Sequence, residues 1–361
     1  MKIAIRVDAS PVIGSGHLMR CLTLADRLAA ADAQVRFVCR QMPQSLEALI
    51  RDAGHECARL PALAAGDFTP TADDSPHAGW LGIEWTIDAD ETAAALADQP
   101  AWDWLIVDHY GLDTRWQGRM RQAAKRIMVI DDLADRAHDC DLLLDQNLYA
   151  DMAARYTEHV PANCRLLLGP RHALLRAAFA TLRAKVQPRD GEVKRLLVFL
   201  GGMDAGNVTS IVLQALDKLP RREFATDVVI GAGHPAREAI ERECARLGLT
   251  CHVQTPRMAE LMAAADLAIG AGGTATWERC ALALPAIIVV IANNQREIAA
   301  AIHQNGAAIS VGEITASLMN EIKSQLLVLL SDPKRLRTMS AAAYSLTDGE
   351  GASRVVKSME E

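Results

Sequence analysis

Residues 2–29 read KIAIRVDASPVIGSGHLMRCLTLADRLA, and this stretch decides the fold. Apolar residues alternate over residues 2–8 and then recur at helical spacing from His17 to Ala29, so the sequence predicts a strand followed by a helix. The turn between them, Gly14-Ser15-Gly16-His17, is rich in glycine, which lets backbone N–H groups approach a ligand at the positive end of a helix dipole. We therefore expect a parallel α/β domain to begin here.

His17 falls in the first turn of the predicted helix. The helix dipole disfavours imidazolium at that position and keeps the ring neutral and basic, as a general base near neutral pH requires. The alternative is a histidine that only caps a helix. If His17 is a base, Asp8 or Asp108, each at the end of a predicted strand, would hold its other ring nitrogen and fix the tautomer.

Length and composition set the class of protein. With 361 residues, half of them apolar, the chain has room for two domains with separate cores. A net charge of −7 and the lack of a sustained Lys/Arg block argue against nucleic acid as a partner. Eight cysteines without a C-x-x-C pair are typical of reduced thiols in a cytoplasmic protein, not of a disulfide framework or a zinc knuckle.

The lack of targeting and membrane-spanning signals also favours a cytoplasmic protein. No signal peptide is visible, and the longest apolar stretch, residues 283–292, is too short to span a bilayer. The basic run Arg115, Arg119, Arg121, Lys125 and Arg126 is expected to be a solvated helix face. We therefore expect a cytoplasmic monomer or weak dimer without membrane insertion.

Strand and helix patterns alternate along the whole chain, which is typical of parallel α/β architecture. The first half predicts strands at residues 2–8, 35–40, 104–108, 127–131 and 142–145, with an irregular connection and one short helix over residues 58–100. The chain is expected to form a first domain (1–170), a linker (171–192), a second domain (193–335) and a C-terminal helix and tail (336–361). Two Rossmann-like domains would place ligands in a central cleft, at the carboxyl ends of their strands.

Two glycine turns in the second half have the chemistry of a phosphate site. Gly201-Gly202 and Gly272-Gly273 each precede a predicted helix, whose N–H groups could hold a diphosphate. Neither turn is a Walker A loop or a G-x-G-x-x-G fingerprint, which weakens a nicotinamide hypothesis. Glu278, on the helix after the second turn, could accept from both ribose hydroxyls of a nucleotide. Ordinary strand–helix turns and an exposed helix glutamate are the alternatives.

Motifs spread over nearly the whole chain carry a family resemblance. In the first half they are Arg6-Val7-Asp8-Ala9-Ser10, Ile13-Gly14-Ser15-Gly16-His17, Arg20-Cys21, Val107-Asp108-His109-Tyr110, Ile130-Asp131-Asp132 and Ala173-Leu174-Leu175-Arg176. In the second half they are Gly201-Gly202-Met203-Asp204, Gly272-Gly273-Thr274, Trp277-Glu278 and Asn294-Gln295. Together they resemble the UDP-2,4-diacetamido-2,4,6-trideoxy-β-L-altropyranose hydrolases of pseudaminic acid biosynthesis, which contribute to flagellin glycosylation and cell-surface polysaccharide.

The resemblance implies a GT-B-like fold and a reaction. The family removes UDP from its sugar by attack of water at the anomeric carbon, with C–O cleavage and inversion and without a metal or cofactor. By resemblance, His17 activates the water, and Tyr110 and Asn294 place the sugar and the reacting groups. The residues expected to take part in catalysis are His17, Tyr110, Asp108 and Asn294. Those expected to bind the UDP-sugar are Arg6, Asp8, Gly14, Gly16, Arg20, Gly201, Gly202, Met203, Asp204, Gly272, Gly273, Thr274, Glu278 and Gln295.

Two departures from the family pattern concern the sugar. His172 stands where the family pattern has a tyrosine, and residues 63–99 are longer than expected. The alternatives are a GT-B glycosyltransferase with a sugar or lipid acceptor, and a non-catalytic sugar-nucleotide-binding protein of polysaccharide assembly. A nicotinamide oxidoreductase lacks its fingerprint.

Overall fold

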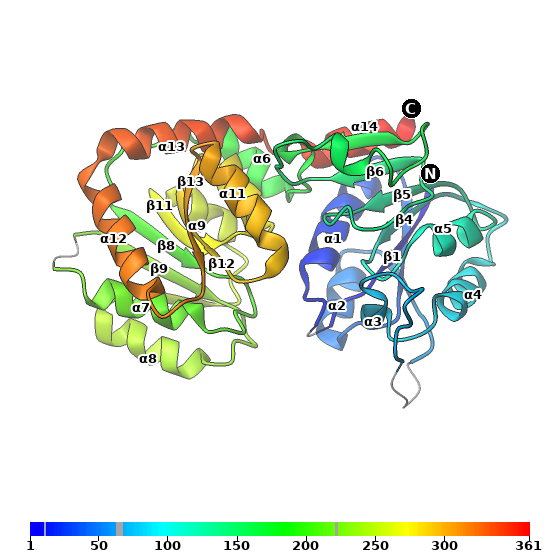
Figure 1. Ribbon diagram of the computed structural model, residues 1–361, viewed down its shortest axis with the longest axis horizontal. Helices are drawn as coiled ribbons and strands as arrows, with labels where there is room; N and C mark the ends of the chain where they lie inside the picture. Colours follow the sequence, from blue (N-terminus) through cyan, green and yellow to red (C-terminus); the bar gives the residue numbers. More distant parts are fainter. Residues whose placement is uncertain (11, 63–67, 221–222) are drawn as a thin grey trace. The chain divides into compact units, whose positions relative to one another are not determined.

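The computed structural model describes residues 1–10, 12–62, 68–220 and 223–361. These residues divide into two compact units (Figure 1). Unit 1 comprises Met1–Asn147, Asp151–Leu174 and Gly351–Glu361, and unit 2 comprises Leu148–Ala150 and Leu175–Glu350.

A parallel sheet forms the centre of unit 1. Its strands are β1 (Lys2–Val7), β2 (Gln34–Cys39), β3 (Glu56–Arg59), β4 (Trp102–Asp108), β5 (Ala124–Ile130), β6 (Leu142–Asp145) and β7 (Arg165–Leu168). Over the described residues these seven strands are ordered β3-β2-β1-β4-β5-β6-β7 and are all parallel. Because helices cover both faces of such a sheet, its strands are buried on both sides and are mostly apolar. Every residue of β1 except Lys2 is buried.

Helices cover both faces of this sheet and build a core on each. One face carries α1 (Gly16–Ala29), α2 (Gln44–Asp52) and α14 (Gly351–Glu360), and the other carries α3 (Ala78–Leu81), α4 (Trp85–Leu96) and α5 (Thr114–Met120). The first core includes Ile3 of β1, Leu24 of α1 and Val355 of α14. Both chain ends therefore lie in unit 1 (Figure 1).

Unit 2 repeats this architecture. Its strands are β8 (Arg195–Phe199), β9 (Ala225–Ile230), β10 (Thr250–Val253), β11 (Leu267–Ala271), β12 (Ala286–Val290) and β13 (Ala308–Glu313). In the described part of the chain, they form a six-stranded parallel sheet in the order β10-β9-β8-β11-β12-β13. Its helices are α6 (Ala177–Arg183), α7 (Val208–Asp217), α8 (Arg237–Leu247), α9 (Met258–Ala264), α10 (Ala275–Ala281), α11 (Arg296–Gln304), α12 (Leu318–Ser331) and α13 (Pro333–Leu346).

Each sheet reverses its strand order at one point. In unit 1 the reversal lies between β1 and β4, where Val7 is paired with Asp108. In unit 2 it lies between β8 and β11, where Gly270 is paired with Phe199. Ligands of open α/β sheets bind at the carboxyl ends of the strands at such a switch point. The loops that follow these four strands are therefore where a site is expected.

The structure differs from the sequence-based expectations in three places. The edge strands β3 and β7 were not predicted, because β3 is short and carries charged Glu56 and Arg59 without a buried pattern. The stretch 58–100 holds α3 and the 12-residue α4, while residues 63–67 of the long segment lie outside the described residues. The expected 171–192 linker includes α6, which belongs to unit 2, and the expected 336–361 tail is divided between the units.

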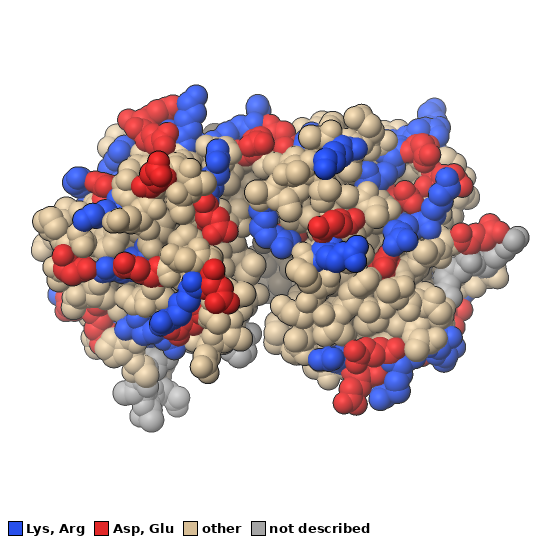
Figure 2. All heavy atoms as spheres, turned by 180° about the vertical axis from the view of Figure 1, so that it is seen from behind, with Lys and Arg blue, Asp and Glu red and all other residues tan. Residues whose placement is uncertain are grey.

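Charges are mixed over the surface. Figure 2 shows basic and acidic side chains interspersed on the face it presents. In the basic run singled out above, four residues pair with carboxylates: Arg115 with Asp113, Arg119 with Asp90, Arg121 with Asp139 and Asp141, and Lys125 with Asp103. Among the described residues, no helix is both long and apolar enough to cross a membrane.

Candidate active site

The switch point of unit 1 brings an imidazole and a carboxylate together. His17 is the second residue of α1, and Asp108 is the last residue of β4. Nδ1 of His17 lies 2.5 Å from Oδ1 of Asp108. An unprotonated Nδ1 and a carboxylate oxygen would repel each other at this distance. The ring proton therefore sits on Nδ1, and this N–H donates a hydrogen bond to the Asp108 carboxylate. This tautomer leaves Nε2 of His17 with its lone pair, as a general base requires.

Arg20 fixes the Asp108 carboxylate from the next turn of α1. Its Nε donates to Oδ2 of Asp108 and its Nη2 to Oδ1, both at 2.6 Å, so the pair is bidentate. Burial alone would raise the pKa of Asp108, but the charge of Arg20 and the hydrogen bonds from Arg20 and His17 outweigh it and hold this pKa well below its usual range. Asp108 therefore stays ionised and orients His17. Arg20 was expected to bind the substrate, and here it supports the base.

Tyr110 forms one wall beside His17. The two ring centroids are 4.6 Å apart in an edge-to-face arrangement. The Tyr110 hydroxyl donates to Oδ2 of Asp132 at 2.6 Å. Burial and the Asp132 carboxylate raise the pKa of Tyr110 well above its usual value, so the phenol keeps its proton.

Arg6 and Asp8, which were expected to bind the substrate, lie behind the site. Both are fully buried, and Nη1 of Arg6 donates to Oδ1 of Asp8 at 2.7 Å. Asp8 also accepts from the backbone N–H of Arg40, at 2.7 Å. The pair therefore has a structural role in this structure, and the expected contact with the substrate stays a prediction. Asp8 is also excluded as the partner of His17, which is Asp108.

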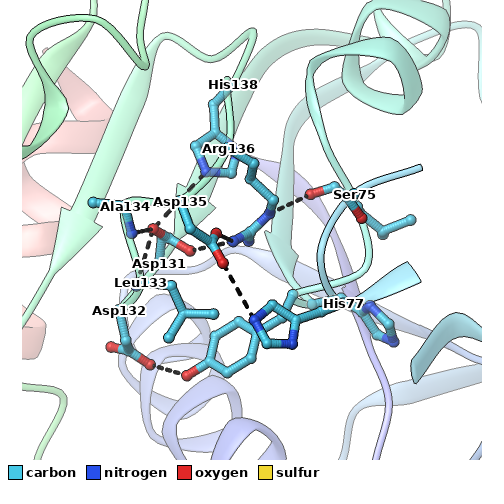
Figure 3. A network of polar contacts seen from close by, with 12 residues as sticks. Ser75, His77, Asp131, Asp132, Leu133, Ala134, Asp135, Arg136 and His138 are labelled. Carbon is cyan, nitrogen blue, oxygen red and sulfur yellow. Dashed lines mark hydrogen bonds and ion pairs between the residues drawn. The ribbon is translucent and has the colours of Figure 1, made fainter. Parts of the chain in front are cut away.

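A polar network lies next to Tyr110, whose ring centroid is 5.7 Å from the guanidinium carbon of Arg136. Figure 3 shows this network around Asp131, Asp135 and Arg136. Nη1 of Arg136 lies 2.9 Å from a carboxylate oxygen of Asp131 and 2.9 Å from one of Asp135. Nε2 of His77 reaches Oδ2 of Asp135 at 3.2 Å. Figure 3 shows His77 pointing toward Asp135 from a segment separate in sequence. His77 could not be predicted as a site residue from the sequence, because residues 58–100 carry no clear periodicity.

The glycines of unit 1 shape the start of α1. Gly14 has φ +80°, a conformation that favours glycine, and its N–H donates to the Ser10 carbonyl at 2.7 Å. Gly16 is the first residue of α1. A Cβ on either residue would meet no atom within 4 Å, so both backbones are open on that side. This suits a close approach of a ligand to the backbone beside His17.

The two glycine turns of unit 2 follow the adjacent strands β8 and β11. A Cβ on Gly201 or Gly202 would also meet no atom within 4 Å. At the second turn, Oε1 of Gln295 accepts from Gly272 N–H at 3.3 Å, and a Cβ on Gly272 would lie 3.3 Å from Cβ of Gln295. Gln295 thus holds this turn in place. Met203 is exposed and Thr274 occupies the N-cap position of α10, next to Gly273.

Asp204 was expected to bind the substrate, but it is occupied within its own loop. It is buried and accepts from the backbone N–H groups of Val208 and Thr209, at 2.9 and 2.8 Å. The Thr209 hydroxyl and Nε2 of His234 lie 2.6 and 3.2 Å from its Oδ2. Asp204 therefore caps α7 and shapes the Gly201-Gly202 turn, and its expected contact with the substrate stays a prediction.

Glu278 and Asn294 complete the set of expected site residues. Glu278 lies in α10, and Nη2 of Arg176 approaches its Oε1 at 3.5 Å. Burial raises the pKa of Glu278, although Arg176 and Arg279 act in the opposite direction. Asn294 is exposed, in a 3-10 turn that spans Asn293–Gln295. Among the residues described, no group of three or more His, Cys, Asp or Glu could hold a metal ion.

The architecture is shared with solved glycosyltransferases. MurG of Acinetobacter baumannii superposes with a TM-score of 0.66 at 14% identity, over 99% of each chain. The calicheamicin glycosyltransferase CalG4 does so with a TM-score of 0.60 at 15% identity, over 99% of this chain and 97% of that one. The chain has a GT-B fold. Residues 195–357, which form most of the second half of this GT-B chain, match the glycosyltransferase family 28 C-terminal domain.

Three relatives of this GT-B chain include a hydrolase and a transferase. The spore coat polysaccharide biosynthesis protein SpsG of Bacillus subtilis is 28% identical over 59% of this chain and 63% of SpsG. The UDP-2,4-diacetamido-2,4,6-trideoxy-β-L-altropyranose hydrolase of Campylobacter jejuni is 24% identical over 67% of this chain and 74% of that enzyme. The UDP-N-acetylglucosamine–N-acetylmuramyl-(pentapeptide) pyrophosphoryl-undecaprenol N-acetylglucosamine transferase of Mycobacterium bovis is 27% identical over 95% of this chain and 85% of that enzyme. The comparisons thus support transfer at least as well as the expected hydrolysis.

Proposed function

We propose that this protein is an enzyme that cleaves the glycosyl–phosphate bond of a UDP-sugar and passes the sugar to a hydroxyl group. The observation that carries the proposal is the His17–Asp108 pair at the switch point of unit 1, with Nε2 of His17 left to accept a proton. The names of the relatives support the choice of a UDP-sugar, since both the hydrolase and the transferase act on one.

His17 acts as the general base. Its Nε2 takes the proton of the attacking hydroxyl as the oxygen bonds to the anomeric carbon and the bond to the diphosphate breaks. Asp108 accepts the Nδ1–H bond throughout, and it stabilises the imidazolium that forms. Because Arg20 holds both carboxylate oxygens, the His17 ring keeps one orientation.

Unit 2 binds the nucleotide in this proposal. The backbone N–H groups of the Gly201-Gly202 and Gly272-Gly273 turns receive the diphosphate, and Glu278 receives the ribose hydroxyls after exchanging its contact with Arg176. A diphosphate leaves as a weak base, so stabilising its charge can replace a general acid. Asn294, exposed in its 3-10 turn, is proposed to help place the reacting groups.

The acceptor is the point on which two candidate functions differ. Transfer to a sugar or lipid hydroxyl is the first candidate, because the transferase relative matches over 95% of this chain and a glycosyltransferase domain matches residues 195–357. Hydrolysis is the second, favoured by the motifs around His17 and Tyr110 and by the C. jejuni relative. The hydrolase would act in pseudaminic acid biosynthesis on UDP-2,4-diacetamido-2,4,6-trideoxy-β-L-altropyranose, with inversion.

A time course with a UDP-sugar alone separates the candidates. The protein is incubated with UDP-N-acetylglucosamine or with UDP-2,4-diacetamido-2,4,6-trideoxy-β-L-altropyranose, and UDP and the product anomer are followed by NMR. Fast UDP release without an acceptor identifies a hydrolase, whereas release that requires an added glycan or lipid acceptor identifies a transferase. Binding without turnover under both conditions would contradict both candidates and indicate a sugar-nucleotide-binding protein.

Replacing the base tests the mechanism. His17→Leu should lower the rate of UDP release by about 10²–10⁴-fold, the usual contribution of general-base catalysis, while the melting temperature changes little. The matched control is His55→Leu, because His55 is as buried as His17 and also contacts an aspartate, with Nε2 3.0 Å from Oδ1 of Asp26. The control should keep its rate, and undiminished turnover by His17→Leu would refute the assignment.

A further inference from the structure

We propose that Trp80 is a stacking platform for the sugar ring of the donor, with Tyr110 continuing the aromatic surface toward His17. This inference rests on the proposed function and deepens it, because it assigns a site for the glycosyl group. Trp80 lies in α3, in the segment that gave no clear pattern in the sequence.

Trp80 stands out among the six tryptophans of the chain. Trp102, Trp104, Trp116 and Trp277 are buried, whereas Trp80 and Trp85 are partly exposed. Trp85 has a structural explanation, since the Arg115 guanidinium lies 5.4 Å from its ring centroid. The aromatic neighbours of Trp80 are instead Tyr110 and His77, and Tyr110 borders the base.

The segment that carries Trp80 is fastened to the strand ends beside the site. Nε2 of Gln41 donates to the Trp80 carbonyl at 2.8 Å, and the Ser75 hydroxyl donates to the Gly111 carbonyl at 3.3 Å. Leu81, next to Trp80, is buried in the core against this face of the sheet. A Cβ on Gly111 would lie 2.9 Å from the His77 carbonyl oxygen, so the segment packs directly on the turn after β4.

The rings form one surface that leads to the base. The centroids of Trp80 and Tyr110 are 5.2 Å apart with an angle of 35° between the planes. Tyr110 meets the His17 ring at 4.6 Å. Tyr110 itself is almost fully buried, so Trp80 provides the accessible part of this surface. A pyranose has an apolar C–H face that fits a flat ring, and ligand sites combine such apolar walls with a few fixed polar groups.

His77 supplies a polar group at the edge of this surface. Its ring centroid is 5.5 Å from that of Trp80, and its Nε2 is 3.2 Å from Oδ2 of Asp135 (Figure 3). When Nε2–H donates to the Asp135 carboxylate, Nδ1 is an acceptor. It can receive a hydrogen bond from a hydroxyl or an amide N–H of the sugar, so the subsite suits a sugar ring with a donor substituent beside its apolar face.

The affinity for UDP and for a UDP-sugar, measured separately by calorimetry, tests this platform. The sugar nucleotide is UDP-N-acetylglucosamine or UDP-2,4-diacetamido-2,4,6-trideoxy-β-L-altropyranose, whichever the wild type binds more tightly. Trp80→Ala should weaken binding of the UDP-sugar by about tenfold, the order expected for one lost aromatic partner, and leave the Kd for UDP unchanged. Trp80→Phe should recover most of the loss, and Trp85→Ala, the control, should change neither Kd.

Each result decides something different. Trp80→Ala overturns the platform if it leaves both Kd values unchanged or raises both by the same factor. The proposed function survives either of these outcomes, provided that His17→Leu still lowers the rate of UDP release as expected. Failure of the wild type to bind UDP would refute the proposed function and the platform with it. Trp80→Phe also removes an indole, so quenching of tryptophan fluorescence by the UDP-sugar should fall in this variant and persist in Trp85→Phe.

Discussion

At the scale of single residues, Asp8 and Asp108 show how similar positions acquire different roles. Each aspartate lies at or just after the carboxyl end of a central strand, and each was a candidate partner for His17. Arg6, two residues before Asp8, shares its side of β1 and occupies its carboxylate. Asp108 has no such neighbour on β4; its partners Arg20 and His17 both come from α1. The presence of Arg6 beside Asp8 therefore determines which of the two carboxylates orients the base.

A third aspartate at a strand end, Asp145, predicts an unusual pH dependence of stability. Burial, reinforced by the charge of Asp132, raises the pKa of Asp145 to about 7. The native state then binds a proton between the pKa of the unfolded chain, near 4, and about 7, where the unfolded state does not. The contribution of Asp145 to stability is thus full below pH 4 and is lost as the pH rises to 7.

Asp145→Asn should remove this dependence, because the amide keeps the shape of the protonated acid without titrating. Urea unfolding at pH 5 and pH 8 measures the effect. The fall in the free energy of unfolding between these two values should be larger in the wild type than in Asp145→Asn. Comparing the wild type with Asp145→Asn cancels the contributions of other titrating groups. One of these is His138, whose pKa is lowered by burial to about 4. Equal pH dependence in both proteins would show that Asp145 is ionised throughout.

At the scale of elements, α4 is attached to the sheet by a buried ion cluster. Asp88 in the first turn of α4 accepts from Nη2 of Arg6 at 2.7 Å and from Nη2 of Arg40 at 2.9 Å. The indole N–H of Trp116 in α5 donates to the same carboxylate at 3.0 Å. One side chain thus connects α4 with β1, with the end of β2 and with α5. Arg6 also donates to Asp8, so the cluster extends to the residue that follows β1.

Removing this connection should be costly. Asp88→Ala leaves the buried guanidinium groups of Arg6 and Arg40 without their shared carboxylate, and breaking such a cluster typically costs about 3–5 kcal/mol. Asp90→Ala is the matched control on the same helix, since the exposed Asp90 pairs with Arg119 at the surface and should matter little. Chemical denaturation of both variants measures the difference. Equal stability of the two would show that the cluster is not what secures α4.

Most elements with strong periodicity could be predicted from the sequence. The switch-point strands of unit 1, β1 and β4, and helix α1 were all predicted, because their apolar patterns are long and regular. The edge strand β3 could not be predicted, since a four-residue strand with exposed ends and a partly buried middle has no recognisable period. Helix α4 was underestimated because its apolar residues do not gather on one side: Asp88 and Thr92 point inward as buried polar residues.

The candidate site was only partly predictable. Its position followed from the glycine turn before His17 and from polar residues after strands. The partner of His17 required the strand order, which sets Val7 beside Asp108. Burial of Arg6, Asp8 and Asp204 also depends on tertiary packing, and the same residue types could equally have faced a ligand.

At the scale of the whole molecule, unit 1 is built from separate parts of the chain. The last helix, α14, belongs to unit 1, although it follows α13 of unit 2 directly in sequence. Its Val355, Val356 and Met359 enter the same core as the side chains of α1 and β1. The backbone carbonyl of Met359 also accepts from the indole N–H of Trp104 in β4, at 3.1 Å.

Met359→Ala should therefore destabilise unit 1 and spare unit 2. A buried Met→Ala change typically costs about 2–5 kcal/mol. Scanning calorimetry should show a transition for each unit, because two-domain chains often unfold in separate steps, and only the transition of unit 1 should move down. Lys357→Ala, an exposed change on the same helix, should move neither. A shift confined to unit 2 would contradict the assignment of α14.

The return of α14 to unit 1 has a consequence during translation. The ribosome makes residues 1–174 first, then residues 175–350, which form nearly all of unit 2, and only afterwards the residues of α14. Until then the nascent unit 1 lacks part of one core face, and the apolar side of α1, which packs against α14 in the finished fold, stays accessible to water and to chaperones. The half that carries His17 can thus complete its packing only after the nucleotide-binding half proposed here has been synthesised.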